Sequence, residues 1–262
     1  MVRVLSAIVL LPAVFAAVWF LDTAGLLIVV EAILILAMLE YARLSAGLGA
    51  DLPVVPATVA AGLTCAAVAW PGGPVEVAWM AGTLALASIS VGWGRVASTT
   101  LTSVFSAAFA MAYVGLPLGC LVRIHRLDGP GAVLALLLTV AASDTAQYYT
   151  GRLLGRHKLS PAISPNKTVE GAIGGLTFGT LAMVLLGAWW RPEAGALGMA
   201  GLGLVAVSLG ILGDLFESLL KRSAGVKDSS NLIPGHGGVL DRIDALLFAA
   251  PCYYLALTYG VF

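Results

Sequence analysis

The sequence has few charged residues for its length. Of its 262 residues, 11% are Asp, Glu, Lys or Arg, and 60% are hydrophobic. Soluble domains carry about 25% charged residues, so this chain lacks the polar surface that would keep it in water. It has 14 basic and 14 acidic residues, and a chain without net positive charge is not typical of a general nucleic-acid binder. We therefore expect an integral membrane protein with no nucleic-acid partner.

Cysteine is also scarce, and the three that occur lie far apart. Cys65, Cys120 and Cys252 each stand within an apolar stretch. An odd, widely spaced set of this kind predicts neither a disulfide framework nor a zinc site. We expect all three to be small buried side chains.

Long apolar runs fill most of the chain, and runs of the roughly 20 residues that cross a bilayer recur about nine times. The expected spans are 4–21, 24–42, 54–71, 75–93, 101–121, 131–152, 171–190, 197–221 and 245–262. The first run lacks a clean small-residue cleavage site, and a second run follows at once, so we interpret it as a helix rather than a signal peptide. The predicted fold is all-α, a polytopic membrane protein of about nine transmembrane helices in a single domain, 1–262.

Basic residues are distributed unevenly over the expected loops. With a cytoplasmic N-terminus, the inner segments hold eleven of the fourteen Lys and Arg residues, and the outer loops hold only Arg123, Arg126 and Arg191. Cytoplasmic segments of membrane proteins are enriched in Lys and Arg. We therefore expect segments 152–170 and 221–244 to face the cytoplasm, across the inner or plasma membrane if the source is bacterial.

The charged residues gather in the second half of the chain. Seventeen of the 28 lie between Asp144 and Asp244, and only eight lie in the first 121 residues. We therefore interpret residues 1–121 mainly as scaffold helices and residues 131–262 as the catalytic half. Placing ionisable groups beside hydrocarbon costs free energy, so their presence there indicates a functional role. The two polar segments of this half are 143–171 and 214–244.

Segment 143–171 begins with a carboxylate inside an expected span. Asp144, Gln147 and Tyr148 share one helix face, and an Asp at mid-span costs about 2.5–3.5 kcal/mol on insertion scales. We therefore expect Asp144 to face a polar cavity. The alternative is a structural aspartate, capped by neighbouring hydroxyls or paired with an arginine.

The rest of this segment contains two Ser-Pro steps and four Lys or Arg residues, which predict a turn-rich loop rather than a helix. Ser164, Asn166 and Lys167 offer a hydroxyl, an amide and an ammonium that suit phosphate oxygens. The G-x-x-x-x-G-K-[ST] spacing of a P-loop is missing. A basic loop that meets lipid headgroups explains the same residues, and both interpretations stay open.

Segment 214–244 contains ten ionisable side chains. They are Asp214, Glu217, Lys221, Arg222, Lys227, Asp228, His236, Asp241, Arg242 and Asp244. Asp214, Glu217 and Lys221 fall on one stripe of the eighth span, and Asp241 and Asp244 point one way if the ninth helix begins there. The alternative is a network of surface salt bridges. Exposed bridges are worth about 0–1 kcal/mol each, too little to place an Asp and a Glu within a span.

The composition of this segment indicates its chemistry. Several carboxylates without a Cys or His cluster favour a hard cation with oxygen ligands, such as Mg²⁺. The basic residues would supply counter-charge for a polyphosphate, and Gly237 and Gly238 let the backbone approach a ligand closely. These features predict metal-assisted chemistry on phosphates at a membrane surface.

From Ser218 to Asp244 the sequence resembles the signature of phosphatidate cytidylyltransferases, also called CDP-diacylglycerol synthases, without departure over 27 positions. The matching residues are Ser218, Leu220-Lys221-Arg222, Lys227-Asp228, Ser230, Ile233-Pro234, His236-Gly237-Gly238-Val239 and Asp241-Arg242-Ile243-Asp244. Segments 143–145 and 163–171 also resemble family motifs, with Asn166 where a lysine is more usual. Before residue 143 the resemblance rests on hydropathy alone.

The resemblance implies that CTP and phosphatidate react to give CDP-diacylglycerol and pyrophosphate, a step of phospholipid biosynthesis. The expected mechanism is in-line attack of the lipid phosphate on the α-phosphorus of CTP, in which positioning and charge neutralisation carry most of the rate. The implied cofactor is Mg²⁺, with room for a second cation. The expected partners are CTP, phosphatidate and membrane lipid, and the sequence allows a homodimer.

Matching positions to motifs assigns the site residues, on the expectation that the segments around Asp144 and Lys167 converge on the 214–244 run. The metal ligands are Asp214 and Asp241 first, then Asp244 and Asp144. The catalytic residues are Asp214, Asp241, Lys221, Arg222 and His236. The substrate-binding residues are Ser164, Asn166, Lys167, Lys227, Asp228, Gly237, Gly238 and Arg242. His236 is alternatively a turn histidine that bonds local backbone, and Glu217 orients a basic partner or a metal-bound water.

Two other classes of function compete with this interpretation. A transporter would more often spread its charges through inverted repeats at mid-bilayer, whereas these charges gather at one expected edge. The second competitor is a related enzyme that acts on a polyprenol or isoprenoid phosphate, as cytidylyl acceptor or as kinase substrate. The choice of acceptor could be set by residues in the N-terminal half. A CDP-alcohol phosphotransferase is disfavoured because its D-G-x2-A-R…G-x3-D-x3-D pattern is absent.

Overall fold

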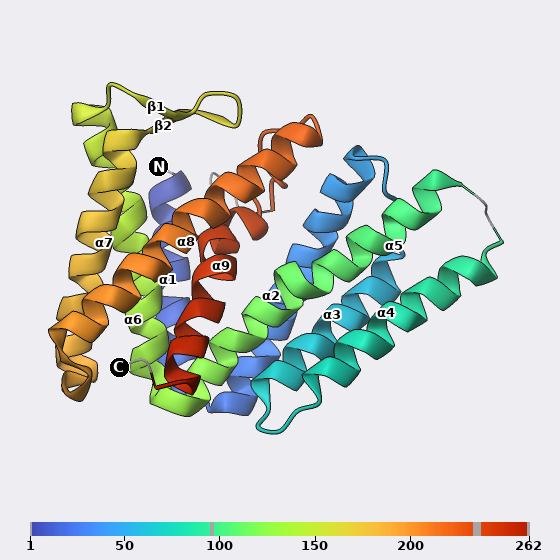
Figure 1. Ribbon diagram of the computed structural model, residues 1–262, viewed down its shortest axis with the longest axis horizontal. Helices are drawn as coiled ribbons and strands as arrows, with labels where there is room; N and C mark the ends of the chain where they lie inside the picture. Colours follow the sequence, from blue (N-terminus) through green and yellow to red (C-terminus); the bar gives the residue numbers. More distant parts are fainter. Residues whose placement is uncertain (1, 95–96, 233–236, 261–262) are drawn as a thin grey trace. The chain divides into compact units, whose positions relative to one another are not determined.

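A computed structural model describes residues 2–94, 97–232 and 237–260, and most of them lie in α-helices joined by short connections (Figure 1). The helices are α1 Val2–Phe20, α2 Thr23–Gly47, α3 Val54–Ala69, α4 Val75–Gly92, α5 Ser98–Ala110, α6 Leu116–Leu154, α7 Val169–Trp190, α8 Gly195–Ser223 and α9 Leu240–Thr258. A π-helical turn, η1 (Met111–Gly115), joins α5 to α6, and a 3-10 turn, η2 (Pro192–Ala194), precedes α8. The predicted all-α fold is confirmed.

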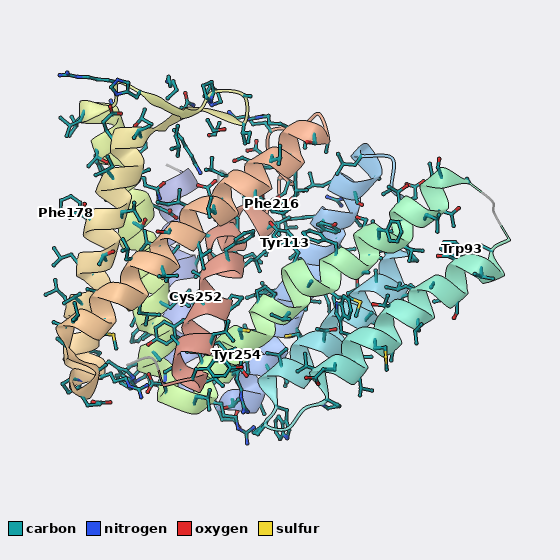
Figure 2. All side chains as sticks on the ribbon, viewed as in Figure 1. Trp93, Tyr113, Phe178, Phe216, Cys252 and Tyr254 are labelled. Atoms are coloured by element: carbon teal, nitrogen blue, oxygen red, sulfur yellow. The ribbon has the colours of Figure 1, made fainter. Side chains whose placement is uncertain are left out.

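Five helical segments are long and apolar enough to cross a membrane. They are Thr23–Gly47, Val75–Gly92, Ser98–Leu154, Val169–Trp190 and Pro192–Ser223. Large apolar side chains cover the outside of these helices. Phe178, for example, extends away from α7 (Figure 2) and is 52% exposed. The chain is therefore a polytopic integral membrane protein, and the count of nine spans remains a prediction.

Gly129 divides α6 into two helices. Its φ of 79° and ψ of −178° are not helical, and Pro130, which follows, has no N–H to continue the helical hydrogen bonds. The indole of Trp190 packs against Gly129 and Gly131 and donates a hydrogen bond from Nε1 to the carbonyl oxygen of Asp128 at 2.9 Å. The 57-residue segment Ser98–Leu154 therefore breaks between the expected spans 101–121 and 131–152.

The chain forms two compact units, one of residues 1–126 with 220–243 and the other of residues 127–219 with 244–262. In the first unit, α2, α3, α4 and α5 pack as consecutive neighbours (Figure 1). Cys65 of α3 and Cys120 of α6 are buried free thiols, as expected, and Cys252 is a half-buried free thiol.

Glycines bring the helices of the second unit close together. A side chain at Gly175 of α7 would meet Gln147 and Ser143 of α6, and a Cβ at Gly179 would lie 2.7 Å from Val207 of α8. Close backbone approach of this kind is how helices associate in a membrane, where apolar burial between helices gives little driving force.

Two short strands connect α6 to α7 in the second unit, β1 (Lys158–Ser160) and β2 (Ser164–Thr168) (Figure 1). They pair antiparallel with an irregular register, Lys158 opposite Thr168 and Ser160 opposite Ser164. The sequence predicted only a turn-rich loop here, because proline in a strand is confined to edges and irregular pairing. Thr168 then caps α7 by accepting a hydrogen bond from the N–H of Gly171 at 3.1 Å.

We expect Gly179→Leu to lower the stability of the second unit, because the added side chain must push α7 away from Ser143 and Val207. Overpacking typically costs about 1–3 kcal/mol, which corresponds to a fall of roughly 2–10 °C in melting temperature. Thermal unfolding in detergent measures it. Gly201→Leu on α8 is the matched control, because nothing lies within 4 Å of a Cβ there. Equal melting temperatures for the two variants would show that the α7 contact is not tight.

Candidate functional site

Asp241, in the first turn of α9, accepts hydrogen bonds on both carboxylate oxygens. Its Oδ1 accepts from Nζ of Lys221 at 2.5 Å. Its Oδ2 accepts from the N–H of Ser229 at 3.1 Å, the hydroxyl of Ser229 at 2.7 Å and the N–H of Gly238 at 2.7 Å. The Asp241 side chain is only 7% exposed. This carboxylate is therefore fixed in one orientation beside an ammonium.

A second carboxylate, Glu40 of α2, lies in the same cluster and is 2% exposed. It accepts hydrogen bonds from the hydroxyls of Ser229 and Ser230, at 3.0 and 2.6 Å. It also accepts from the N–H groups of Val239 and Leu240, at 2.9 and 2.7 Å. The first N–H groups of a helix have no intrahelical partner, so Glu40 caps α9 from another helix. Sequence reasoning missed Glu40, whose only signal was a carboxylate within an apolar run.

The two glycines before α9 leave room for these carboxylates. Gly237 has a φ of +78°, which favours glycine, and a Cβ there would lie 2.7 Å from Oδ2 of Asp241. A Cβ on Gly238 would collide with the hydroxyl of Ser229 and with Oε2 of Glu40. The sequence predicted that these glycines permit close backbone approach to a ligand. In the structure they permit close approach to Asp241 and Glu40.

The second unit contains another ammonium–carboxylate pair. Nζ of Lys167, on β2, lies 2.5 Å from Oδ2 of Asp214, on α8. The side chains are 19% and 30% exposed, respectively, so the pair is half-buried rather than fully solvated. The structure thus brings together two of the predicted site residues that are 47 positions apart in the sequence.

Glu170, in the first turn of α7, tethers the base of the β-hairpin. Its carboxylate accepts hydrogen bonds from the N–H of Arg156 at 3.0 Å, from the N–H of His157 at 3.2 Å and from Nδ1 of His157 at 2.7 Å. The hairpin that carries Lys167 is therefore held at its base, because Glu170, two residues after β2, binds the two residues that precede β1.

Helix α8 carries Asp214, Glu217 and Lys221 as the predicted stripe. Asp214 and Lys221 are two turns apart, about 10 Å along the helix axis. Glu217, between them, is fully buried at 0% exposure. Arg222, one residue later, is exposed and donates from a terminal guanidinium nitrogen to the carbonyl oxygen of Val226 at 3.2 Å.

The other predicted site residues have different surroundings. Asp144 is exposed and accepts a hydrogen bond from Nε2 of Gln147 at 3.1 Å. Asp244 is 9% exposed, and its Oδ1 accepts from the N–H of Ala245 at 2.7 Å. The exposed residues are Asn166, Lys227, Asp228 and Arg242, and Ser164 is half-buried. His236, with Ile233 and Pro234 of the signature, lies outside the described residues.

The described ranges contain no group of three or more His, Cys, Asp or Glu side chains that could hold a metal ion. Asp144, Asp214 and Asp244, which all belong to the second unit, therefore do not gather into a three-carboxylate site there. Asp214 and Asp241 are each paired with a lysine.

Comparison with known proteins gives matches over nearly the whole chain. The model of the cytidylyltransferase family matches residues 1–260. The phosphatidate cytidylyltransferase of Pseudomonas aeruginosa is 34% identical over 263 residues, covering 96% of this chain and 94% of the relative. That of Staphylococcus aureus is 33% identical and covers 98% of each chain. That of Aquifex aeolicus is 38% identical over 160 residues, 61% of this chain and 60% of the relative's length.

We expect Glu170→Ala to loosen the β-hairpin, because the N–H groups of Arg156 and His157 lose their acceptor. Hydrogen bonds to a charged acceptor are stronger than those between neutral groups. Amide hydrogen exchange across residues 156–168 should therefore accelerate, as mass spectrometry can measure. Glu193→Ala is the control, because its side chain is 69% exposed. Unchanged exchange in the Glu170 variant would contradict the tethering role.

Proposed function

Because the chain belongs to the cytidylyltransferase family, we propose that it transfers the cytidylyl group of CTP to phosphatidate, giving CDP-diacylglycerol and pyrophosphate. The relatives that match along almost their whole length are phosphatidate cytidylyltransferases. The structural observation that carries the proposal is the burial and pairing of Asp241. This carboxylate of the signature segment is 7% exposed and is hydrogen-bonded to the ammonium of Lys221.

The reaction makes one phosphorus–oxygen bond and breaks another. A phosphate oxygen of phosphatidate attacks the α-phosphorus of CTP, the bond from that phosphorus to the bridging oxygen breaks, and pyrophosphate leaves with the electron pair. The nucleophile is already an anion, so no strong general base is needed. The main barrier is the approach of two polyanions, since like charges repel strongly at short range. Positioning and charge neutralisation therefore carry most of the rate.

The basic side chains have the roles that this barrier requires. Lys221 and Lys167 are anchored by carboxylates, so we assign them to fixed phosphate positions. The exposed groups Arg222, Lys227 and Arg242 bind phosphates that arrive from water. Ser164, Asn166, Asp228, Gly237 and Gly238 complete the substrate contacts, and His236 is assigned to a phosphate or the leaving group.

We assign Mg²⁺ as the cofactor, with Asp214 and Asp241 as the first ligands and Asp244 and Asp144 after them. Mg²⁺ is commonly held by one or two carboxylates together with substrate phosphates. A site of that kind does not need the three-carboxylate group that is missing from the described residues. Aspartate oxygens are the hard donors that this ion prefers. Bound with CTP, it would neutralise phosphate charge and polarise the α-phosphate; a second cation is compatible with the same assignment.

We propose nine membrane spans, with the active site at the cytoplasmic side. The hairpin 158–168 and the segment 221–244 carry most of the basic residues of the second half, and such residues favour the cytoplasmic side. Phosphatidate reaches this side from the membrane, and CTP from the cytoplasm. A homodimer is compatible with this arrangement.

We expect purified protein in detergent to move label from [α-³²P]CTP to a lipid-extractable product when phosphatidate and Mg²⁺ are present. The same assay with [γ-³²P]CTP should leave the lipid unlabelled, because the γ-phosphate departs in pyrophosphate. Lipid labelled from the γ-position would instead indicate a kinase. Transfer to an isoprenoid phosphate but not to phosphatidate would select the related acceptor, and no transfer with any divalent cation would contradict the proposal.

We expect Asp241→Asn to reduce kcat by about 100-fold or more, the usual loss when a fixed electrostatic group of an active site is removed. The amide keeps the size of the side chain but loses the charge beside Lys221. Asp51→Asn, an exposed carboxylate between α2 and α3, is the control and should keep normal turnover. Size-exclusion chromatography and thermal unfolding verify that both variants fold. Near-normal turnover of Asp241→Asn would show that the assignment of this residue is wrong.

A further inference from the structure

Glu40 stands apart from the segments that carry the family signature, yet it is saturated with hydrogen bonds from one of them. Each carboxylate oxygen accepts one hydroxyl and one backbone N–H. Oε1 accepts from Ser230 and Val239, and Oε2 from Ser229 and Leu240. An ionised carboxylate has about four acceptor directions, so this set satisfies the side chain, which is 2% exposed.

Two routes lead from Glu40 to Asp241. The hydroxyl of Ser229 lies 3.0 Å from Oε2 of Glu40 and 2.7 Å from Oδ2 of Asp241, so its single proton is shared between the two carboxylates. The second route is the backbone, because Glu40 holds the N–H groups of Val239 and Leu240, directly before Asp241. The orientation of Asp241, and with it the position of the Lys221 ammonium, therefore depends on Glu40.

We propose that Glu40 is a positioning residue for the transfer reaction. It acts through Ser229 and the first turn of α9 to fix the carboxylate of Asp241 and the ammonium of Lys221. This inference rests on the proposed role of Asp241. Helix α2, in the half of the chain interpreted as scaffold, thereby helps to position the reacting groups.

Glutamine cannot reproduce this role. Its side-chain amide has one acceptor oxygen and an NH₂ group that only donates. A serine hydroxyl can turn to accept from that NH₂ group, but a backbone N–H cannot. Because each oxygen of Glu40 receives one backbone N–H, either orientation of the amide sets its NH₂ group against Val239 or Leu240. The start of α9 must then shift.

We expect Glu40→Gln to lower kcat roughly 10- to 100-fold, because a shift of about 1 Å in positioned groups costs about 100-fold in rate. The KM values for CTP and phosphatidate should stay within about threefold, since Glu40 is 2% exposed and a positioning defect lowers catalysis more than binding. Ser229→Ala should have a similar effect on kcat. The double variant should fall little further than either single one, because both changes break the same route.

Ser230→Ala is the matched control. Ser230 donates to Oε1 of the same carboxylate at 2.6 Å, but Asp241 Oδ2 takes its hydroxyl bond from Ser229. We expect its kcat to fall less than about threefold. If Glu40 has only a structural role, Glu40→Gln lowers the melting temperature and the yield but leaves the kcat per folded molecule unchanged. Ser229→Ala and Ser230→Ala then have equal kcat values.

The outcomes separate this inference from the proposed function. If Asp241→Asn is inactive while Glu40→Gln and Ser229→Ala both turn over within twofold of the natural chain, the positioning role is overturned and the proposed function stands. If Asp241→Asn is fully active, the assignment of Asp241 fails first, and the inference fails with it. If Glu40→Gln does not fold, the two serine variants decide, and equal kcat values for them overturn the inference.

Discussion

The hydrogen bonds between Glu40 and the start of α9 are the interaction on which the first unit's candidate site depends. A buried carboxylate is tolerated only when its oxygens are paired, and here the pairing donors come from residues 229–240. The same donors would be unsatisfied without it, since helix N–H groups need an acceptor. Each partner therefore requires the other, and the mutual requirement places Asp241 and Lys221.

The second unit depends on close backbone contact instead. Gly175 and Gly179 let α7 approach Ser143 and Val207 closely, and in a bilayer such van der Waals contact between helices favours their association. The β-hairpin leaves this packed set of helices at the start of α7 and is tethered there by Glu170. Lys167 reaches Asp214 from that tethered strand, so its position follows from the helix packing below it.

Local patterns in the sequence predicted the helices, and motif spacing predicted which residues belong together. Apolar runs indicate helices without any tertiary information, and the break at Gly129 follows from a Gly-Pro step. Lys167 was predicted to approach the 214–244 run, and it pairs with Asp214. Glu40 could not be predicted, because its partners are about 190 to 200 positions away and nothing near it in the sequence differs from a scaffold helix. The strands of the hairpin were missed because Pro165 argues against regular pairing.

The charge balance of the signature segment gives a physical reason for a cation in this reaction. Segment 214–244 holds four Lys and Arg residues against five Asp and Glu residues, so with His236 neutral it is slightly acidic. Two of its aspartates are already paired with lysines, Asp241 with Lys221 and Asp214 with Lys167. A triphosphate with about four negative charges therefore meets a segment whose own basic groups cannot neutralise it. The pairs supply orientation, and this charge balance supports the proposal that further positive charge arrives with the substrate, as it would with Mg²⁺ carried on phosphates.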